Sequence, residues 1–115
     1  DYEAAARREL YEETGVRSVR LLAATPGWIA YAFPPEYAAS GAGRGFLGQK
    51  QKWFAYRFLG DDAEIDLDAH GEAEFDAWRW GRLSEACDLI VPFKRDAYRR
   101  VVQAFAAFDG AEDPV

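Results

Sequence analysis

A chain of 115 residues with 20 acidic and 14 basic side chains, and hence a net charge of −6, has the length of one domain and hardly of two. Its one cysteine excludes an internal disulfide, and its one histidine excludes any site that needs two histidines of this chain. The acidic balance disfavours non-specific binding to nucleic acid without excluding a local basic patch. No apolar run approaches the length of a membrane span and no signal-peptide pattern is present, so we expect a cytoplasmic protein with no membrane partner.

The first half of the chain is predicted to contain one helix and two strands. Strong helix formers predict a helix over residues 1–14, capped by its first residue and ended by Gly15 in a left-handed conformation. Residues 18–24 and 28–33 are predicted to be strands on either side of a Thr-Pro-Gly turn. Residues 36–48, which contain four glycines, are predicted to be a loop.

The second half begins with the clearest predicted strand, the aromatic-rich residues 51–59. An acidic, turn-rich segment over 60–72 precedes another predicted strand over 75–80. A serine is expected to cap a short helix over 85–90, and a longer helix is predicted over 92–108, with a proline in its first turn. Its apolar positions recur at helical spacing and should face the core: Ala97, Val101, Phe105 and Phe108.

The order of helix, strands and helices, without repeat or linker, indicates a single α/β or α+β domain over residues 1–108. Residues 109–115 are predicted to be a polar tail. About four short strands with a helix at each end make a thin sheet for a self-sufficient core.

Three carboxylates of the first helix, Glu9, Glu12 and Glu13, lie at positions i, i+3 and i+4 and span about 100° of one helix face. Like charges at this spacing repel each other. A divalent cation such as Mg²⁺ or Mn²⁺ would turn the repulsion into coordination, since these ions favour carboxylate oxygens. The alternative is a solvated acidic face compensated by Arg7 and Arg8, and spacing alone favours it.

The longer string changes this weighting. Residues 8–16 read RELYEETGV and resemble the second half of the Nudix box, G-x5-E-x7-R-E-U-x-E-E-x-G-U, where U is aliphatic. Every fixed position from Arg8 through Gly15 is matched, and the resemblance gives these two residues structural roles. The first Glu of the box, which pairs with Arg8 in the family, would immediately precede Asp1. We therefore expect a Nudix domain that lacks its N-terminal strands, and a 115-residue chain that is inactive and poorly folded by itself.

Three further segments narrow the resemblance: GQKQKWF over 48–54, EFDAWRW over 74–80 and PFKRDAYRR over 92–100. Together they are similar to one Nudix branch, the bacterial RNA 5′-pyrophosphohydrolases and the related asymmetric dinucleoside polyphosphate hydrolases of bacteria and plants. The similarity runs in order from residue 1 to about residue 105.

This resemblance implies the Nudix α/β/α sandwich, with a mixed sheet between helices. It also implies a Mg²⁺- or Mn²⁺-dependent enzyme that removes pyrophosphate or phosphate from RNA 5′ ends. Hydrolysis of dinucleoside polyphosphates is the alternative within enzymes, because it leaves the box unchanged. A non-catalytic nucleotide-binding domain is the alternative outside them, and the intact carboxylates argue against it. A nucleotide or a 5′-phosphorylated RNA end is the expected partner, without stable binding to duplexes.

The resemblance also assigns the metal and catalytic residues. Glu9, Glu12, Glu13 and Glu74 are implied to be metal ligands. Glu12, Glu13 or Glu74 is implied to orient or deprotonate the attacking water, and the sequence does not distinguish among them. Without the EFDAWRW match, Glu74 would be read as a surface residue of an acidic stretch.

Phe93 occupies the position whose ring stacks on the terminal base in the family, and Lys94 beside it could pair with a phosphate. The equal alternative for Phe93 is a core position at the start of the last helix. Tyr31 lies on the strand that the family uses beside the phosphates, and core packing is the alternative there.

Lys50 and Lys52 alternate with glutamines, so they should share one face of a strand. Two cations there suit a polyphosphate chain, and Gln49 is a candidate contact to a base or a phosphate. The alternative for both lysines is a solvent-facing edge.

Overall fold

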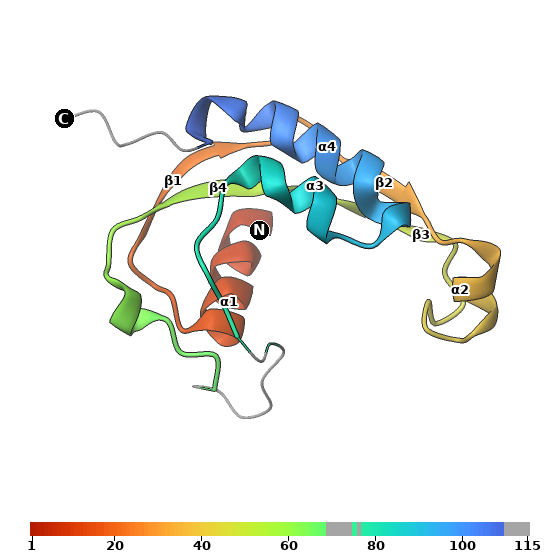
Figure 1. Cartoon of the computed structure of the whole chain (residues 1–115), viewed down its shortest axis with the longest axis horizontal. Helices are drawn as coiled ribbons and strands as arrows, with labels where there is room; N and C mark the ends of the chain where they lie inside the picture. The colour runs from red at the N-terminus through yellow and green to blue at the C-terminus, as the bar shows by residue number, and fades with distance from the viewer. Residues whose placement is uncertain (69–74, 76, 110–115) are drawn as a thin grey trace. The chain divides into compact units, whose positions relative to one another are not determined.

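The computed structural model of the chain describes residues 1–68, 75 and 77–109 (Figure 1). The chain divides into two compact units. The first unit comprises Asp1–Ala23 and Phe54–Trp80, and the second comprises Ala24–Trp53 and Gly81–Val115. Each unit combines helix with strand, so the α+β content predicted from the sequence is confirmed. Within the described residues the strands pair as two two-stranded sheets, one in each unit.

The first unit contains α1 (Tyr2–Thr14), β1 (Val19–Ala24) and β4 (Phe54–Phe58), with β1 paired to β4. In Figure 1, α1 is the red helix beside this strand pair. The Leu59 backbone N–H extends the pairing by donating to the Ser18 carbonyl at 2.7 Å.

Local signals in the sequence define both ends of α1. The Asp1 carboxylate accepts hydrogen bonds from the backbone N–H groups of Glu3, at 2.8 Å, and Ala4, at 3.0 Å. Gly15 ends the helix at φ +76°, and its N–H donates to the Tyr11 carbonyl at 2.8 Å. A Cβ at Gly15 would also lie 3.1 Å from the Glu64 carbonyl oxygen, so glycine is required by conformation and by space. The predicted caps are confirmed.

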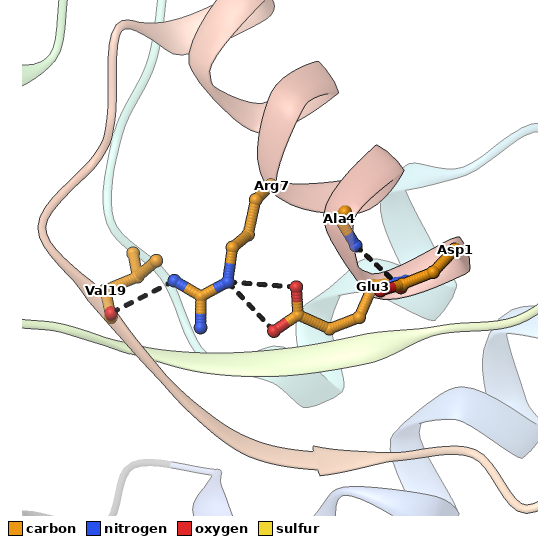
Figure 2. A network of polar contacts seen from close by, with 5 residues as sticks. All are labelled: Asp1, Glu3, Ala4, Arg7 and Val19. Atoms are coloured by element: carbon orange, nitrogen blue, oxygen red, sulfur yellow. Dashed lines mark hydrogen bonds and ion pairs between the residues drawn. The ribbon is translucent and has the colours of Figure 1, made fainter.

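Arg7 connects α1 to both strands of the first unit, and Figure 2 shows its contacts with Glu3 and with Val19 of β1. Its Nε donates to the two carboxylate oxygens of Glu3 at 2.8 and 2.9 Å, and a terminal nitrogen donates to the Val19 carbonyl of β1 at 3.5 Å. Its guanidinium lies 5.1 Å from the centre of the Tyr56 ring of β4. The hydrogen bond to Glu3 raises the pKa of Arg7, and burial raises the pKa of Tyr56.

The second unit is built on an antiparallel hairpin of β2 (Ile29–Ala32) and β3 (Gly48–Gln51). α2 (Pro35–Ala39) lies in the connection between these strands. α3 (Ala86–Leu89) packs against α4 (Arg95–Ala104), and α4 also contacts β2.

The hairpin register sorts its side chains onto two faces. Tyr31 pairs with Gln49, and Ala30 pairs with Lys50. Because side chains alternate along a strand, Tyr31 and Gln49 share the face of the buried Ile29, and Ala30 and Lys50 share the opposite, exposed face.

Ile29 belongs to the core of the second unit together with residues of α4 and its C-terminal end. Ala97, Val101 and Phe105 are 1%, 5% and 4% exposed, which confirms the predicted apolar face of the last helix. Phe108, predicted to join them, is half-buried in the following 3₁₀ turn. In the part of the chain that the structure describes, no helix is long and apolar enough to cross a bilayer.

Two predicted boundaries near the hairpin were wrong. The predicted loop over 36–48 begins with α2, since Pro35 suits a first helical position where no backbone N–H is needed. The predicted strand over 51–59 is divided between β3 and β4. The reason is a tertiary contact between Trp53 and Thr25, in which the Trp53 N–H donates to Thr25 Oγ1 at 3.1 Å and the Thr25 N–H donates to the Trp53 carbonyl at 2.9 Å.

The predicted strand over 75–80 was also wrong, because its described residues form no regular element. Side chains hold this segment instead of a backbone ladder. Trp80 Nε1 donates to the Asp62 carboxylate at 2.7 Å, and the Trp80 ring lies 5.6 Å from the ring of Phe58.

The C-terminal helices differ from the prediction in how they begin. The short helix is preceded by a 3₁₀ turn, Leu83–Glu85, so Ser84 lies inside that turn and does not cap the helix. The Arg82 N–H donates to the Glu85 carboxylate at 2.9 Å. The predicted helix over 92–108 is α4 with a 3₁₀ turn on each side, Pro92–Lys94 and Ala106–Phe108.

Replacing Arg7 by glutamine should lower the thermal unfolding midpoint by a few degrees. The change removes the two bonds to Glu3, the bond to Val19 and the contact with the Tyr56 ring together. Circular dichroism of the full-length protein measures it. Arg99→Gln is the matched control, because Arg99 is 60% exposed and pairs with Asp96 of its own helix, α4. Equal midpoints for the two variants would show that Arg7 does not hold α1.

Candidate active site

The acidic face of α1 is compensated by the arginine of the motif. Arg8 lies between two of the three carboxylates, with terminal nitrogens 4.0 Å from Glu9 Oε1 and 3.4 Å from Glu12 Oε1. Both carboxylate side chains are at least half exposed, at 63% and 50%. Such exposed pairs stabilise the fold little, so a cation could replace Arg8 there at low cost.

The residues of this face fit a hard divalent cation by their chemistry, since Glu9, Glu12 and Glu13 are all carboxylates. Among residues 1–68, 75 and 77–109, no three side chains of His, Cys, Asp or Glu are grouped closely enough to hold a metal ion. Glu74, the fourth ligand implied by the sequence, lies outside the described residues. The metal-binding and catalytic roles of these four residues stay predictions.

In the second unit, four of the predicted substrate-binding residues lie together on one face of the hairpin. The Tyr31 hydroxyl donates to Gln49 Oε1 at 2.7 Å. The Phe93 ring lies 6.0 Å from the Tyr31 ring, and Lys94 Nζ lies 5.4 Å from the same ring. An amide, an ammonium group and two rings are thus grouped, which is a chemistry suited to a base and its phosphate.

Two further aromatic side chains support Phe93. Its ring lies 5.1 Å from that of Tyr37 in α2 and 6.0 Å from that of Phe33, with the latter pair nearly perpendicular at 88°. Phe93 is half-buried. Packing against these rings therefore fixes the position of Phe93, and its stacking on a base stays a prediction.

Lys50 and Lys52 are not part of this group. Their Nζ atoms lie 5.1 and 5.4 Å from the centre of the Trp28 ring. The pleat of the hairpin thus divides the predicted substrate-binding residues, with Tyr31 and Gln49 on one face and the two lysines on the other. Trp28 was missed by sequence reasoning, because its place beside the lysines follows from the strand register.

Comparison with known families agrees with the motif on α1. The family described as "NUDIX domain" matches residues 1–103. The chain belongs to the NUDIX family.

Curated NUDIX relatives extend along nearly the whole chain. A protein of Caulobacter vibrioides named "RNA pyrophosphohydrolase" is 61% identical over 100% of this chain and 67% of its own length. Proteins of the same name from Acidiphilium cryptum and Nitrobacter winogradskyi are 51% and 47% identical, over 96% and 94% of this chain and 69% and 65% of their own lengths. The chain therefore spans about two thirds of these relatives.

The loop that follows the NUDIX helix is fixed by a carboxylate that the sequence did not single out. Glu64 Oε2 accepts hydrogen bonds from the N–H groups of Arg17 at 2.7 Å and Ser18 at 2.8 Å. The Asp66 N–H donates to the Thr14 carbonyl at 2.8 Å. Hydrogen bonds from Ser18, first from its side chain and then from its backbone, together with that from Arg17, lower the pKa of Glu64. No motif marks Glu64 within the acidic segment, so only the fold reveals its role.

Glu64→Gln should lower the thermal unfolding midpoint at neutral pH, and the difference from the parent protein should shrink as the pH falls. The pKa of Glu64 is lower in the folded state, so its stabilisation is fully present above the unfolded value, about 4.3. It is lost as the pH falls through the folded value. Unfolding midpoints between pH 7 and pH 3 measure this, with exposed Glu36→Gln as control. A pH-independent difference would contradict the assignment.

Proposed function

We propose that this chain is a hydrolase of phosphoric anhydrides that removes pyrophosphate or phosphate from the 5′ ends of RNA. The observation that carries the proposal is the complete R-E-x-x-E-E-x-G string on a capped helix, in a chain 61% identical to a protein named "RNA pyrophosphohydrolase". The shared name of the relatives favours RNA ends over dinucleoside polyphosphates.

In this proposal the NUDIX helix supplies the metal-binding face. Glu9, Glu12 and Glu13 hold Mg²⁺ or Mn²⁺ together with Glu74. When bound, the ion neutralises phosphate charge and lowers the pKa of a bound water. A bound cation would compensate the charge of Glu9 and Glu12, which Arg8 contacts in this structure. One of Glu12, Glu13 and Glu74 accepts the proton of the attacking water.

The second unit binds the terminal nucleotide. Phe93 stacks on the base. Its neighbouring rings already hold it in position, so binding costs no further side-chain entropy at this residue. Gln49, Lys94 and the Tyr31 hydroxyl offer polar partners on the same face of the hairpin. The proposal also includes the α/β/α sandwich of the family, with a mixed sheet, and a cytoplasmic location.

Substrate choice is tested by comparing two reactions of the full-length protein. Pyrophosphate and phosphate release from a triphosphorylated RNA oligomer is measured beside ATP formation from diadenosine tetraphosphate, both with saturating Mg²⁺. The proposal expects a larger kcat/KM for the RNA oligomer. A larger value for the dinucleotide would move the assignment to the dinucleoside polyphosphate hydrolases.

Glu13→Gln should lower turnover on the RNA oligomer at least about 100-fold, since losing a general base or a metal carboxylate costs that much or more. The fold should persist, because the change is isosteric and eases repulsion on the acidic face. Turnover and thermal midpoints are measured on the same preparations. Glu36→Gln, an exposed carboxylate in α2, is the control. Unchanged turnover in the Glu13 variant at saturating Mg²⁺ would reject the metal face.

Phe93→Ala should weaken RNA binding about 10-fold and leave Mg²⁺ affinity unchanged, since stacking on a base contributes about 1–3 kcal/mol. Titrations with a non-hydrolysable 5′-triphosphate analogue and with Mg²⁺ alone measure the two affinities. Phe46→Ala is the matched control, because this ring is 66% exposed and lies outside the aromatic group. A variant that unfolds early and binds normally once folded would restrict Phe93 to packing.

A further inference from the structure

The exposed face of the β2–β3 hairpin carries an aromatic ring between two ammonium groups. Trp28 immediately precedes β2 and is 44% exposed. Continuing the register beyond Ile29 and Gln51 places Trp28 opposite Lys52. Lys52 Nζ lies 5.4 Å from the ring centre, and Lys50 Nζ, from the next position on the same face, lies 5.1 Å from it. We call Trp28, Lys50 and Lys52 the tryptophan–lysine platform.

The platform continues into a low floor of small residues. Ala30, Ala32 and Gly48 follow on the same face and line an open hollow of about 470 Å³. The rest of its lining comes from Tyr31, Leu47, Gln49 and Lys50. A Cβ at Gly48 would collide with the Tyr31 carbonyl oxygen and lie 2.9 Å from Ala32 Cα. No residue larger than glycine therefore fits at this position. A flat group can therefore lie in this hollow, next to Lys50 of the platform.

The charged residues of the two hairpin segments are all basic. The two hairpin segments, residues 28–32 and 48–52, contain both lysines and no acidic residue, in a chain with a net charge of −6. The two lysines thus give an acidic chain a local basic patch. A partly exposed ring beside cations is an arrangement found in sites for single-stranded nucleic acid, where bases stack on rings and phosphates pair with lysines.

We propose that the tryptophan–lysine platform binds a later nucleotide of the single-stranded RNA substrate, with its base on Trp28 and the adjoining phosphates on Lys50 and Lys52. The inference rests on the proposed function for the identity of the RNA. The platform takes a later nucleotide because Tyr31 and Gln49, beside Phe93, lie on the opposite face of the hairpin. This contact would make the protein bind an RNA chain more tightly than a single nucleotide.

Binding tests the platform without any turnover. A single-stranded RNA octamer with a 5′-hydroxyl and a 3′ fluorophore is titrated with full-length protein in EDTA, and anisotropy is followed. Trp28→Ala should raise the Kd about tenfold, the loss expected for one stacked base, and Trp28→Phe should restore most of the affinity. Arg99→Gln, a 60% exposed cation of α4, is the control.

Salt dependence separates the lysines from the ring. For single strands, log Kd changes with log salt by about 0.7 per phosphate contacted, so the double variant Lys50→Gln/Lys52→Gln should reduce the slope by about 1.4. Trp28→Ala should leave the slope unchanged. This measurement also keeps the proposal testable if Trp28→Ala fails to fold. Both lysines are exposed, so replacing them should not disturb the fold.

Kinetics locates the platform relative to the reacting end. Trp28→Ala should raise KM about tenfold for a triphosphorylated octamer and leave KM for a nucleoside triphosphate unchanged, with kcat unchanged for both. An equal rise for the two substrates would overturn the assignment to a later nucleotide.

The remaining outcomes separate this inference from the proposed function. Octamer binding that is insensitive to all the platform variants, or a duplex bound as tightly as the single strand, overturns the platform even if the enzyme removes pyrophosphate from RNA. Octamer binding that responds as described, in a protein that releases no pyrophosphate or phosphate, supports the platform and rejects the proposed function.

Discussion

The position of the acidic helix depends on the Glu3–Arg7 pair. None of the thirteen residues of α1, all of which the structure describes, is fully buried, so this helix is not attached by a buried apolar face. Arg7 replaces that attachment with polar contacts, because it binds Glu3 within the helix and reaches Val19 of β1 and the ring of Tyr56 of β4. A helix attached in this way can keep its charged face open to solvent, as a cation site requires.

Charge distribution explains how an acidic protein can act on a polyanion. The carboxylates that would attract a cation lie on α1, and Arg8 partly neutralises them in its absence. The lysines that would attract phosphates lie in the second unit, on or beside hairpin segments without acidic residues. Since exposed charges act mainly within a Debye length, about 8–10 Å, the net charge matters less to an RNA strand than the local one.

Sequence predicted well the features that neighbouring residues determine. The caps of α1 and the apolar face of α4 are local patterns, and both were confirmed. The division of the strand over 51–59 was not predictable in this way, because it follows from the contact of Trp53 with the distant Thr25. The same holds for Glu64, whose partners Arg17 and Ser18 lie 46 or more residues away in the sequence. For the metal site, sequence supplies ligand types and spacing, and the described residues do not assemble them.

The hairpin register links the stability of the second unit to its binding surfaces. A slip of one residue in β3 would move Lys50 to the face of the buried Ile29 and Gln49 to the open face. Such a slip would break the hydrogen bond between Tyr31 and Gln49 and move Lys50 away from the Trp28 ring, so the alternation of glutamine and lysine favours the observed pairing. Gly48 adds to this selection, since only glycine fits where the strand passes close to the Tyr31 carbonyl. The residues that fix the register are thus the ones that keep the terminal-base group and the tryptophan–lysine platform apart, on opposite faces of one strand pair.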